Sequence, residues 1–427
     1  MTPRKLVHDL LIKAEKSAQY SNISLDNALS KQEFSPADKK LVSIIFYGVT
    51  ERKLFLDYQI GSLSSRKIES LDINVLTALR IGLYQLIYLD RIPPHAAINE
   101  SVDLVSKKSS GFVNAILRSF QRRGEPILPN SDDILEYISI CYSIGKPLAS
   151  LLIKTLGEEE TKKFLEAINE ATPITLRTNT LLTSREELMK NIEGASPTKN
   201  SSSGIYTKGS VRDLYGFEEG YFFVQDEASQ IAIEALGAKE NDTVMDLCSC
   251  PGSKSFGAAI EMKNKGQIYS FDLHENKLSL VINSAKRLKI DIIKTAAADA
   301  RNPIAEFEGT ADKVICDVPC SGFGVLSKKP ELRYKDPNLS ASLPKIQRDI
   351  LENACRYLKK GGILLYSTCT ILPAENENNV LEFLKRHPEF SLMPWQVGSI
   401  SASSGMITLL PHLHNTDGFF IAKLIKN

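Results

Sequence analysis

Two cysteines, Cys320 and Cys369, stand in short motifs that directly follow apolar, strand-like runs. The first motif reads Asp-Val-Pro-Cys-Ser-Gly over residues 317–322, and the second reads Tyr-Ser-Thr-Cys-Thr over residues 366–370. If both runs are strands of one parallel sheet, their exit loops meet at the edge where such sheets bind ligands. Cysteine is a strong nucleophile even at neutral pH, so the pair suits covalent catalysis. The alternative is that each is a small buried hydrophobic residue, as single cysteines usually are.

An earlier strand-like run, residues 243–247, leads into a loop that reads Asp-Leu-Cys-Ser-Cys-Pro-Gly-Ser-Lys over residues 246–254. The loop is neither Gly-x-Gly-x-x-Gly nor the phosphate-binding Gly-x-x-x-x-Gly-Lys-Ser, which disfavours dinucleotides and nucleoside triphosphates. Asp272 and Asp299 follow the next two expected strands, where a carboxylate can accept ribose hydroxyls or an adenine amino group. The pattern favours an adenosine-type cofactor without a pyrophosphate. Turn glycines and helix-capping aspartates are the structural alternative.

Zinc is another use for thiols in this region. Four cysteines could supply thiolates to one ion: Cys248, Cys250, Cys316 and Cys320. Their C-x-C and C-x₃-C spacings differ from the usual C-x₂-C knuckle, and no histidine stands beside them. The sequence therefore disfavours a metal site.

The pattern of the chain predicts a multidomain protein. Residues 1–125 read as helices throughout, with apolar side chains three to four residues apart over 71–89, and predict an all-α domain. Residues 132–235 mix helical patterns with a strand-like run at 173–178 and predict linker helices plus a small α+β domain. From residue 236 onward strands alternate with helices, which predicts an α/β, Rossmann-like, doubly wound domain to residue 427. Expected strands are 243–247, 267–272, 292–296, 313–317, 363–367 and 418–424; expected helices include 96–107, 111–123, 254–262, 275–288 and 345–358.

Composition and charge exclude several classes of protein. With 427 residues, 43% hydrophobic and 24% charged, the chain is close to the globular average. Its longest apolar stretch, residues 41–49, is far below the ~20 residues of a membrane span. Seven thinly spread cysteines indicate a reducing cytoplasm. Net charge is only +1, but residues 1–125 hold 18 Lys/Arg against 13 Asp/Glu, and the remainder 34 against 38.

A polyanion would therefore be held by local basic clusters, and two are candidates. The first is Lys107, Lys108, Arg118, Arg122 and Arg123. The second follows the Pro-Cys motif and comprises Lys328, Lys329, Arg333 and Lys335. Solvated charged faces are the alternative for both.

Residues 132–427 resemble the RNA cytosine-5 methyltransferases that use S-adenosyl-L-methionine. The likeness is carried by residues 220–230, 246–254, 272, 299, 317–322, 367–370 and 411–420. Residues 1–125 are similar to the helical NusB fold, on residues 79–86, 93–100 and 112–118. The two together resemble the bacterial small-subunit (16S) ribosomal RNA methyltransferase B family. Two positions depart from the family's Cys-Ala-Ala-Pro-Gly-Gly-Lys loop, because Cys250 replaces an alanine and Ser253 a glycine.

The resemblance implies a role for each candidate residue. Cys369 would attack carbon 6 of cytosine, and Cys320 would help to remove the proton from carbon 5. S-adenosyl-L-methionine would be bound by Cys248, Ser249, Cys250, Pro251, Gly252, Ser253, Lys254, Asp272, Asp299 and Asp317. The partner would be a single-stranded or loop cytosine of small-subunit ribosomal RNA, since the base must leave its stack. A monomer without a membrane partner is expected as well. The alternatives for the function are the same chemistry on another RNA, such as transfer RNA, or a non-catalytic RNA-binding assembly factor.

Overall fold

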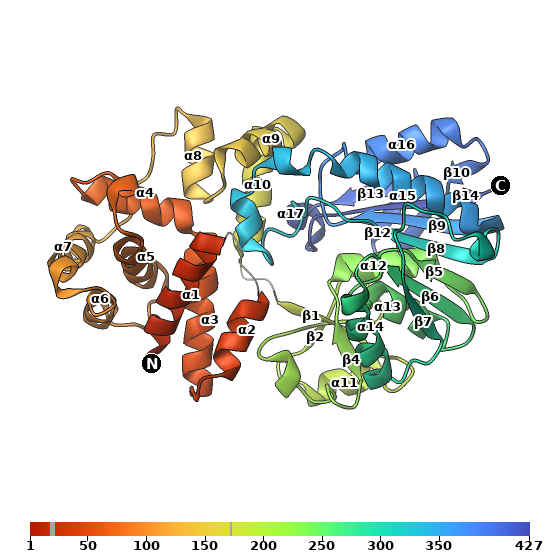
Figure 1. Ribbon diagram of the computed structural model, residues 1–427, viewed down its shortest axis with the longest axis horizontal. Helices are drawn as coiled ribbons and strands as arrows, with labels where there is room; N and C mark the ends of the chain where they lie inside the picture. Colours follow the sequence, from red (N-terminus) through yellow and green to blue (C-terminus); the bar gives the residue numbers. More distant parts are fainter. Residues whose placement is uncertain (18–21, 171–172) are drawn as a thin grey trace. The chain divides into compact units, whose positions relative to one another are not determined.

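The computed structural model describes residues 1–17, 22–170 and 173–427 (Figure 1). The chain divides into two compact units. The first, which we call the helical unit, comprises residues 1–165 together with residues 328–336. The second, the sheet unit, comprises residues 166–327 and 337–427. The chain therefore passes from the sheet unit into the helical unit and back again shortly after the Pro-Cys motif.

The helical unit is built on a buried central helix, α5 (Ile73–Tyr88). Asp72 caps its N-terminus by accepting a hydrogen bond from the Asn74 amide, and its apolar side chains enter a core shared with the neighbouring helices. Those neighbours are α1 (Pro3–Ser17), α2 (Asn22–Ser30), α3 (Pro36–Glu51), α4 (Lys53–Leu63), α6 (Pro94–Val102) and α7 (Lys107–Arg123). Helix α8 (Ile134–Cys141) packs against α4, α9 (Lys146–Leu156) packs against α8, and α10 (Glu158–Asn169) leads into the sheet unit.

Three of the four boundaries differ from the expected helices 96–107 and 111–123. Helix α6 begins at Pro94 and ends at Val102, and α7 begins at Lys107. The chain leaves the helical conformation at Ser106, which is extended with φ −65° and ψ 156° and precedes α7 as its N-cap residue. The expectation that the first helix reaches residue 107 was therefore wrong.

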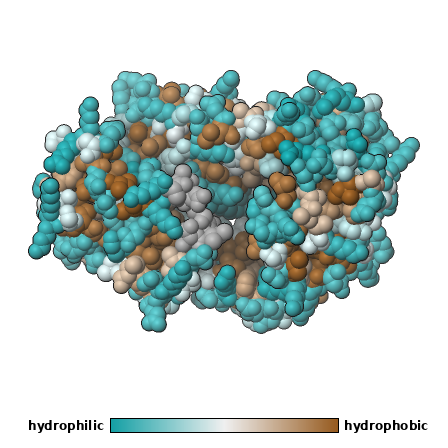
Figure 2. Space-filling model, viewed as in Figure 1, coloured by the Kyte–Doolittle hydropathy of each residue, from teal (hydrophilic) through white to brown (hydrophobic). Residues whose placement is uncertain are grey.

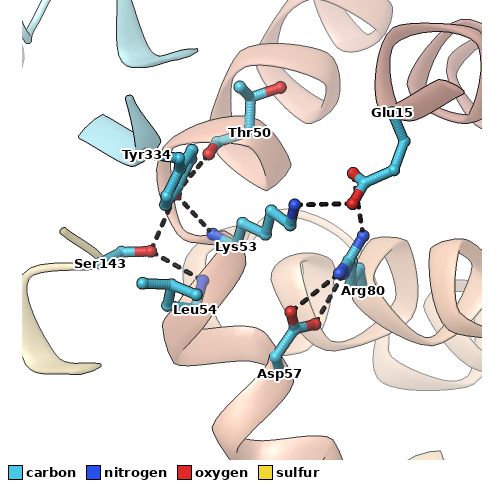
Figure 3. A network of polar contacts seen from close by, with 8 residues as sticks. All are labelled: Glu15, Thr50, Lys53, Leu54, Asp57, Arg80, Ser143 and Tyr334. Atoms are coloured by element: carbon cyan, nitrogen blue, oxygen red, sulfur yellow. Dashed lines mark hydrogen bonds and ion pairs between the residues drawn. The ribbon is translucent and has the colours of Figure 1, made fainter. Parts of the chain in front are cut away.

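Residues 328–336 form an integral part of the helical unit. Their short 3₁₀ helix η4 (Pro330–Tyr334) packs against α3. The Tyr334 hydroxyl donates to the Thr50 carbonyl at 2.7 Å and accepts from the Lys53 amide at 3.2 Å, so it joins the end of α3 to the start of α4 (Figure 3). Ser143 lies 3.0 Å from the same hydroxyl and accepts from the Leu54 amide. Burial raises the pKa of Tyr334 to about 12, so the hydroxyl keeps its proton.

A chain of ion pairs continues from this junction. Lys53 Nζ lies 2.6 Å from Glu15, and Arg80 bridges Glu15 to Asp57, which it binds through two nitrogens at 2.7 and 2.8 Å (Figure 3). Arg80 is only 5% exposed, and a buried guanidinium is tolerated only where carboxylates pair with it. The network fixes α1, α4 and α5 relative to one another.

We predict that Tyr334→Phe destabilises the helical unit by about 1–3 kcal/mol, because the Thr50 carbonyl and the Lys53 amide lose their partner inside the protein. Urea unfolding followed by circular dichroism measures the effect. Tyr58→Phe, on α4, is the matched control, because no hydrogen bond of its hydroxyl is found among the described residues. Equal unfolding midpoints for the two variants would show that the junction contributes nothing.

The sheet unit contains a mixed eight-stranded sheet with the order β10-β14-β9-β8-β5-β6-β7, and β13 pairs with β14. Strands β7, β6, β5, β8 and β9 are parallel, and β14 is antiparallel to β9. The order reverses between β5 and β8, and doubly wound sheets bind ligands at such a point. The strands are β5 (Thr243–Asp246), β6 (Gln267–Asp272), β7 (Ile293–Ala297), β8 (Ala311–Asp317), β9 (Leu358–Thr368), β10 (Phe390–Leu392), β13 (Met406–Leu409) and β14 (Phe419–Lys426).

Helices cover both faces of this sheet (Figure 1). One apolar core contains side chains of α12 (Glu227–Leu236), α13 (Ser253–Glu261) and α14 (Glu275–Arg287). The other contains side chains of α15 (Leu343–Tyr357) and α16 (Glu377–Arg386). Neighbouring residues of one strand enter opposite cores, as Ile315 and Cys316 do, because side chains alternate along a strand. The expected helix 345–358 ends at Tyr357, because β9 already begins at Leu358.

A separate four-stranded antiparallel sheet precedes α12, with the order β2-β3-β1-β4. Its strands are β1 (Ile174–Thr178), β2 (Ser196–Pro197), β3 (Gly204–Thr207) and β4 (Phe222–Val224), with α11 (Arg185–Asn191) beside them.

On the face shown in Figure 2 hydrophilic side chains predominate over both units. None of the described helices is long and apolar enough to cross a membrane.

Candidate functional site

The loop after β5 begins the candidate site. At Gly252, φ is +108°, and a Cβ there would come within 2.4 Å of the Phe256 ring, so only glycine fits this turn. Helix α13 starts at the next residue, Ser253. Farther back in the loop, the Ser249 amide donates to the Phe271 carbonyl at 2.8 Å, which ties the loop to the end of β6. The loop is therefore held close to the carboxyl ends of two neighbouring strands.

Asp272, the last residue of β6, faces this loop. Its carboxylate accepts from the Cys250 amide at 3.2 Å and from the His274 amide at 3.0 Å. Burial and the negative charge of Asp272 raise the pKa of Cys250 to about 11. The thiol that replaces the family's alanine therefore stays protonated at neutral pH, which makes it a poor nucleophile.

A cavity of about 430 Å³ opens at this edge of the sheet. Asp272, Asp299 and Asp317 bring carboxylates to its lining, and Cys248 and Cys250 line it as well. Basic side chains of His274, Lys277 and Arg301 also line it, and apolar side chains form much of the remaining wall, among them Leu247, Val318, Leu343, Ile346 and Ile350. Ser249, Pro251, Gly252, Ser253 and Lys254, which were also expected to bind a cofactor, do not line this cavity and lie in or directly after its loop.

Asp299 is already engaged by a neighbour. Both of its carboxylate oxygens accept from Arg301, at distances from 2.5 to 3.1 Å. These hydrogen bonds lower the pKa of Asp299 and keep it ionised at the rim of the cavity. The role of Arg301 was not apparent from the sequence, although this residue stands only two positions after Asp299.

Asp317 ends β8 and links the cavity to the two cysteines. One of its oxygens accepts from Lys254 Nζ at 2.8 Å, and the other accepts from Ser367 Oγ at 2.8 Å. Lys254 is only 7% exposed and lies 5.2 Å from the centre of the Phe419 ring. The lysine at the start of α13 is therefore a buried partner of Asp317 and not a solvated surface residue.

The two cysteine motifs meet as the sequence predicted. Strands β8 and β9 are parallel neighbours, with Asp317 paired in register to Ser367, so the loops that follow lie side by side. The Gly324 amide donates to the Cys369 carbonyl at 3.0 Å. The Sγ atoms of Cys320 and Cys369 are 3.1 Å apart. Two thiols at this distance can share one proton.

The environment of the pair disfavours ionisation of Cys320. The hydrogen bond with Cys369 and burial both raise the pKa of Cys320, and the negative charges of Glu375 and Asp317 act in the same direction. Cys320 therefore holds its proton firmly. For the same reason Cys320, once ionised, is a strong base.

Sequence reasoning missed Glu375 and Asn376, which lie buried behind the cysteines. Their position six and seven residues after Cys369 was the available signal.

The zinc alternative gains no support: in the part of the chain that the structure describes, no three His, Cys, Asp or Glu side chains are grouped to hold a metal ion.

Comparisons with known proteins agree with this architecture. A model of the family described as 16S rRNA methyltransferase RsmB/F matches residues 233–425, and a NusB family model matches residues 1–122. The probable ribosomal RNA small subunit methyltransferase B of Bacillus subtilis (strain 168) is 34% identical over 441 residues, which cover 99% of this chain and 98% of that protein. The chain belongs to the RsmB/F family.

Solved structures support the fold of this RsmB/F protein. The crystal structure of PH0851 covers 100% of this chain and 99% of its own, with a TM-score of 0.80 and 29% identity. The structure of NSun6 from Pyrococcus horikoshii with SFG covers 65% of this chain and 97% of its own, with a TM-score of 0.58 and 24% identity, and shows the shared fold alone. The expected fold class, a helical NusB domain and a Rossmann-like methyltransferase domain, is confirmed.

The expected cofactor of this RsmB/F methyltransferase, S-adenosyl-L-methionine, is likewise confirmed. The cavity fits this molecule on its own chemistry. Asp272 offers carboxylate oxygens to the two hydroxyls of a ribose, and the apolar side chains of α15 offer a wall to a flat adenine ring.

The two basic clusters are arranged differently from what the sequence suggested. In the second cluster, Arg333 has no solvent exposure and lies 3.4 Å from Glu51, so the expectation that it grips RNA was wrong. Members of the first cluster all lie on α7, but Lys107 and Arg122 stand at opposite ends, about 22 Å apart at the rise of an α-helix. That cluster is therefore two basic ends of one helix.

Proposed function

We propose that this protein forms 5-methylcytosine in small-subunit (16S) ribosomal RNA through a covalent adduct between Cys369 and the target cytosine. One observation carries the proposal: the Sγ atoms of Cys369 and Cys320 lie 3.1 Å apart at the ends of adjacent parallel strands. Full-length relatives in Bacillus subtilis and Synechocystis that carry the name ribosomal RNA small subunit methyltransferase B support the choice of RNA.

The first step is nucleophilic addition. Carbon 5 of cytosine is a poor nucleophile, so the Cys369 thiolate adds to carbon 6 and pushes the C5–C6 electron pair into the ring. Carbon 5 then behaves like an enamine carbon, and one difficult reaction becomes two easier ones. S-adenosyl-L-methionine supplies an electrophilic methyl group when bound.

The last step removes the proton from carbon 5. Cys320 first releases its own proton to solvent, and its thiolate then accepts the carbon 5 proton directly or through a water. The electron pair of the C5–H bond re-forms the C5–C6 double bond, and the C6–S bond breaks to release Cys369. The raised pKa of Cys320 suits this role, because a thiolate with a high pKa holds a proton firmly.

Asp317 holds the base in this scheme. Its oxygens accept from Lys254 and Ser367 and keep lone pairs for the 4-amino group of cytosine. Because Asp317 also lines the cofactor cavity, it stands where the base and the methyl donor have to meet. Lys254 fixes the orientation of its carboxylate.

Among the proposed cofactor residues, Asp272 should have the largest effect on binding. We predict that Asp272→Ala weakens S-adenosyl-L-methionine binding by about 10- to 100-fold, because charge-assisted hydrogen bonds contribute about 1.5–3 kcal/mol. Isothermal titration calorimetry measures the change. Asp291→Ala is the matched control, since Asp291 is exposed and does not line the cavity. Equal dissociation constants would remove Asp272 from the cofactor site.

The substrate is a single-stranded or loop cytosine, because a stacked base cannot reach the paired sulfurs. The basic ends of α7 supply phosphate contacts.

The protein acts as a cytoplasmic monomer. Residues 132–235 serve as linker helices and a small α+β domain between the NusB-like domain (1–125) and the methyltransferase domain (236–427).

A methyl-transfer assay tests the proposal. Purified protein, S-adenosyl-L-methionine and deproteinised 16S ribosomal RNA should yield 5-methylcytosine at one position, which sequencing of bisulfite-treated RNA locates. Methylation of transfer RNA instead would keep the chemistry and change the substrate. No methylation of either RNA, with intact cofactor binding, would favour a non-catalytic assembly factor.

A further inference from the structure

Two consecutive residues, Glu375 and Asn376, lie behind the cysteine pair. They precede α16, and their side chains are 2% and 0% exposed. The Tyr366 hydroxyl donates to the Glu375 carbonyl at 2.6 Å and anchors this backbone to β9. The two side chains therefore hold fixed positions beneath the loops that follow β8 and β9.

The Glu375 side chain accepts hydrogen bonds from the first of the two cysteine motifs and from α15. Its Oε2 accepts from the Ser321 amide at 3.0 Å and from Gln347 Nε2 at 2.8 Å. Gln347, on α15, also donates to the Pro319 carbonyl at 2.9 Å. The peptide groups on both sides of Cys320 are thus held by one carboxylate and the amide bound to it.

Asn376 holds the second motif in the same manner. Its Nδ2 donates to the Thr370 carbonyl at 2.9 Å, and its Oδ1 accepts from Thr368 Oγ1 at 2.6 Å. Thr368 and Thr370 are the residues on either side of Cys369. Asn376 therefore binds both neighbours of Cys369, whereas Glu375 binds one neighbour of Cys320 directly and the other through Gln347.

The two motifs are also joined directly. Ser321 Oγ donates to Thr370 Oγ1 at 2.8 Å, which links the residues that follow the two cysteines. A buried carboxylate is costly unless donors compensate it, and both donors to Glu375 Oε2 belong to the support of Cys320. The carboxylate is thus committed to a position next to the proposed base.

We propose that Glu375 and Asn376 are positioning residues that act on different steps of the reaction. Glu375 sets Cys320 for removal of the carbon 5 proton, and Asn376 sets Cys369 for attack on carbon 6. The inference rests on the proposed function, because it assigns each residue to the step of the cysteine that it supports.

The test separates formation of the adduct from its release. Protein is mixed with S-adenosyl-L-methionine and 16S ribosomal RNA, and denaturing gels follow the covalent protein–RNA species over time. Glu375→Ala should raise the steady-state fraction of adduct at least about fivefold, because one lost hydrogen bond to a buried group costs about 1–3 kcal/mol. Asn376→Ala should slow adduct formation about tenfold or more without accumulation.

Matched variants separate positioning from stability. Glu375→Gln keeps an oxygen acceptor for the Ser321 amide and should restore most of the release rate. Asn376→Asp cannot donate to the Thr370 carbonyl and should not restore attack. Asn378→Ala, an exposed position on α16, should behave as wild type in both readouts. If Glu375→Ala does not fold, Gln347→Leu removes the same support from α15 and should also accumulate adduct.

The inference is overturned if Glu375→Ala and Asn376→Ala each slow adduct formation and adduct release by the same factor. It is also overturned if neither variant changes either rate. Cys320→Ala and Cys369→Ala run beside them report on the proposed function. If Cys320→Ala traps RNA and Cys369→Ala does not, but Glu375 and Asn376 affect one common step, only the positioning roles fail. If the cysteine variants themselves do not separate the steps, the proposed function fails.

Discussion

Cys369→Ala should abolish methylation of 16S ribosomal RNA, with a fall in rate of at least about 10⁴-fold, the order expected when a covalent nucleophile is removed. Alanine cannot add to carbon 6, so carbon 5 is never activated. The Cys369 side chain does not line the cofactor cavity, so binding of S-adenosyl-L-methionine should remain unchanged. Transfer of a radiolabelled methyl group measures the first effect, and calorimetry measures the second.

Cys141→Ala is the control for loss of a thiol, because Cys141 lies on α8 in the helical unit and should retain wild-type turnover. Measurable methylation by Cys369→Ala would mean that another group attacks the base. A loss of cofactor binding that matches the loss of activity would make Cys369 part of the cofactor site.

Cys320→Ala should instead trap the protein on its RNA. Attack by Cys369 and methyl transfer remain possible, but the carbon 5 proton has no acceptor, so the C6–S bond persists. We expect most of the protein to migrate as a denaturation-resistant complex when RNA and cofactor are in excess, while turnover falls to a single event. Wild-type protein under the same conditions should show only a small fraction of this species.

The Cys320→Ala/Cys369→Ala double variant provides the control for that trap. Without the sulfur of Cys369 no adduct can form, so the complex should disappear. A complex that survives in the double variant would show that the trapped bond involves a different side chain, and both roles would have to be reassigned.

Much of the parallel part of the sheet could be predicted because its strands are short β-rich runs, several of which end at or just before a candidate binding or catalytic residue. Asp272 and Asp317 end β6 and β8, as expected. The direction of β14 could not be predicted, since an apolar run reads the same in both directions. Its antiparallel pairing with β9 follows from contacts between residues that are distant in the sequence.

Whether a charged side chain is exposed or buried was the least predictable feature. Arg333 belongs to a Lys/Arg-rich stretch and reads as solvent-facing, but Glu51 and the Tyr142 carbonyl bind it inside the helical unit. Both partners lie far away in the sequence. From the sequence, Lys254 could equally be an exposed residue at the start of a helix. Only the fold brings its Nζ atom within 2.8 Å of the Asp317 carboxylate.

The residues that support the two cysteine loops were missed for a related reason. Glu375 and Asn376 follow a loop and precede a helix, where acidic and amide residues are common as caps. Nothing in their spacing shows that one side chain reaches the Ser321 amide and the other the Thr370 carbonyl. Motifs identify groups that react, whereas groups that hold them become visible only in three dimensions.

The most direct measurement is mass-spectrometric identification of the bond in the trapped Cys320→Ala complex. After digestion with protease and nuclease, we expect one nucleotide joined through carbon 6 of a methylated cytosine to the sulfur of Cys369. A cross-link at any other residue, or the complete absence of a covalent nucleotide from protein that has bound both RNA and S-adenosyl-L-methionine, would contradict the proposed mechanism.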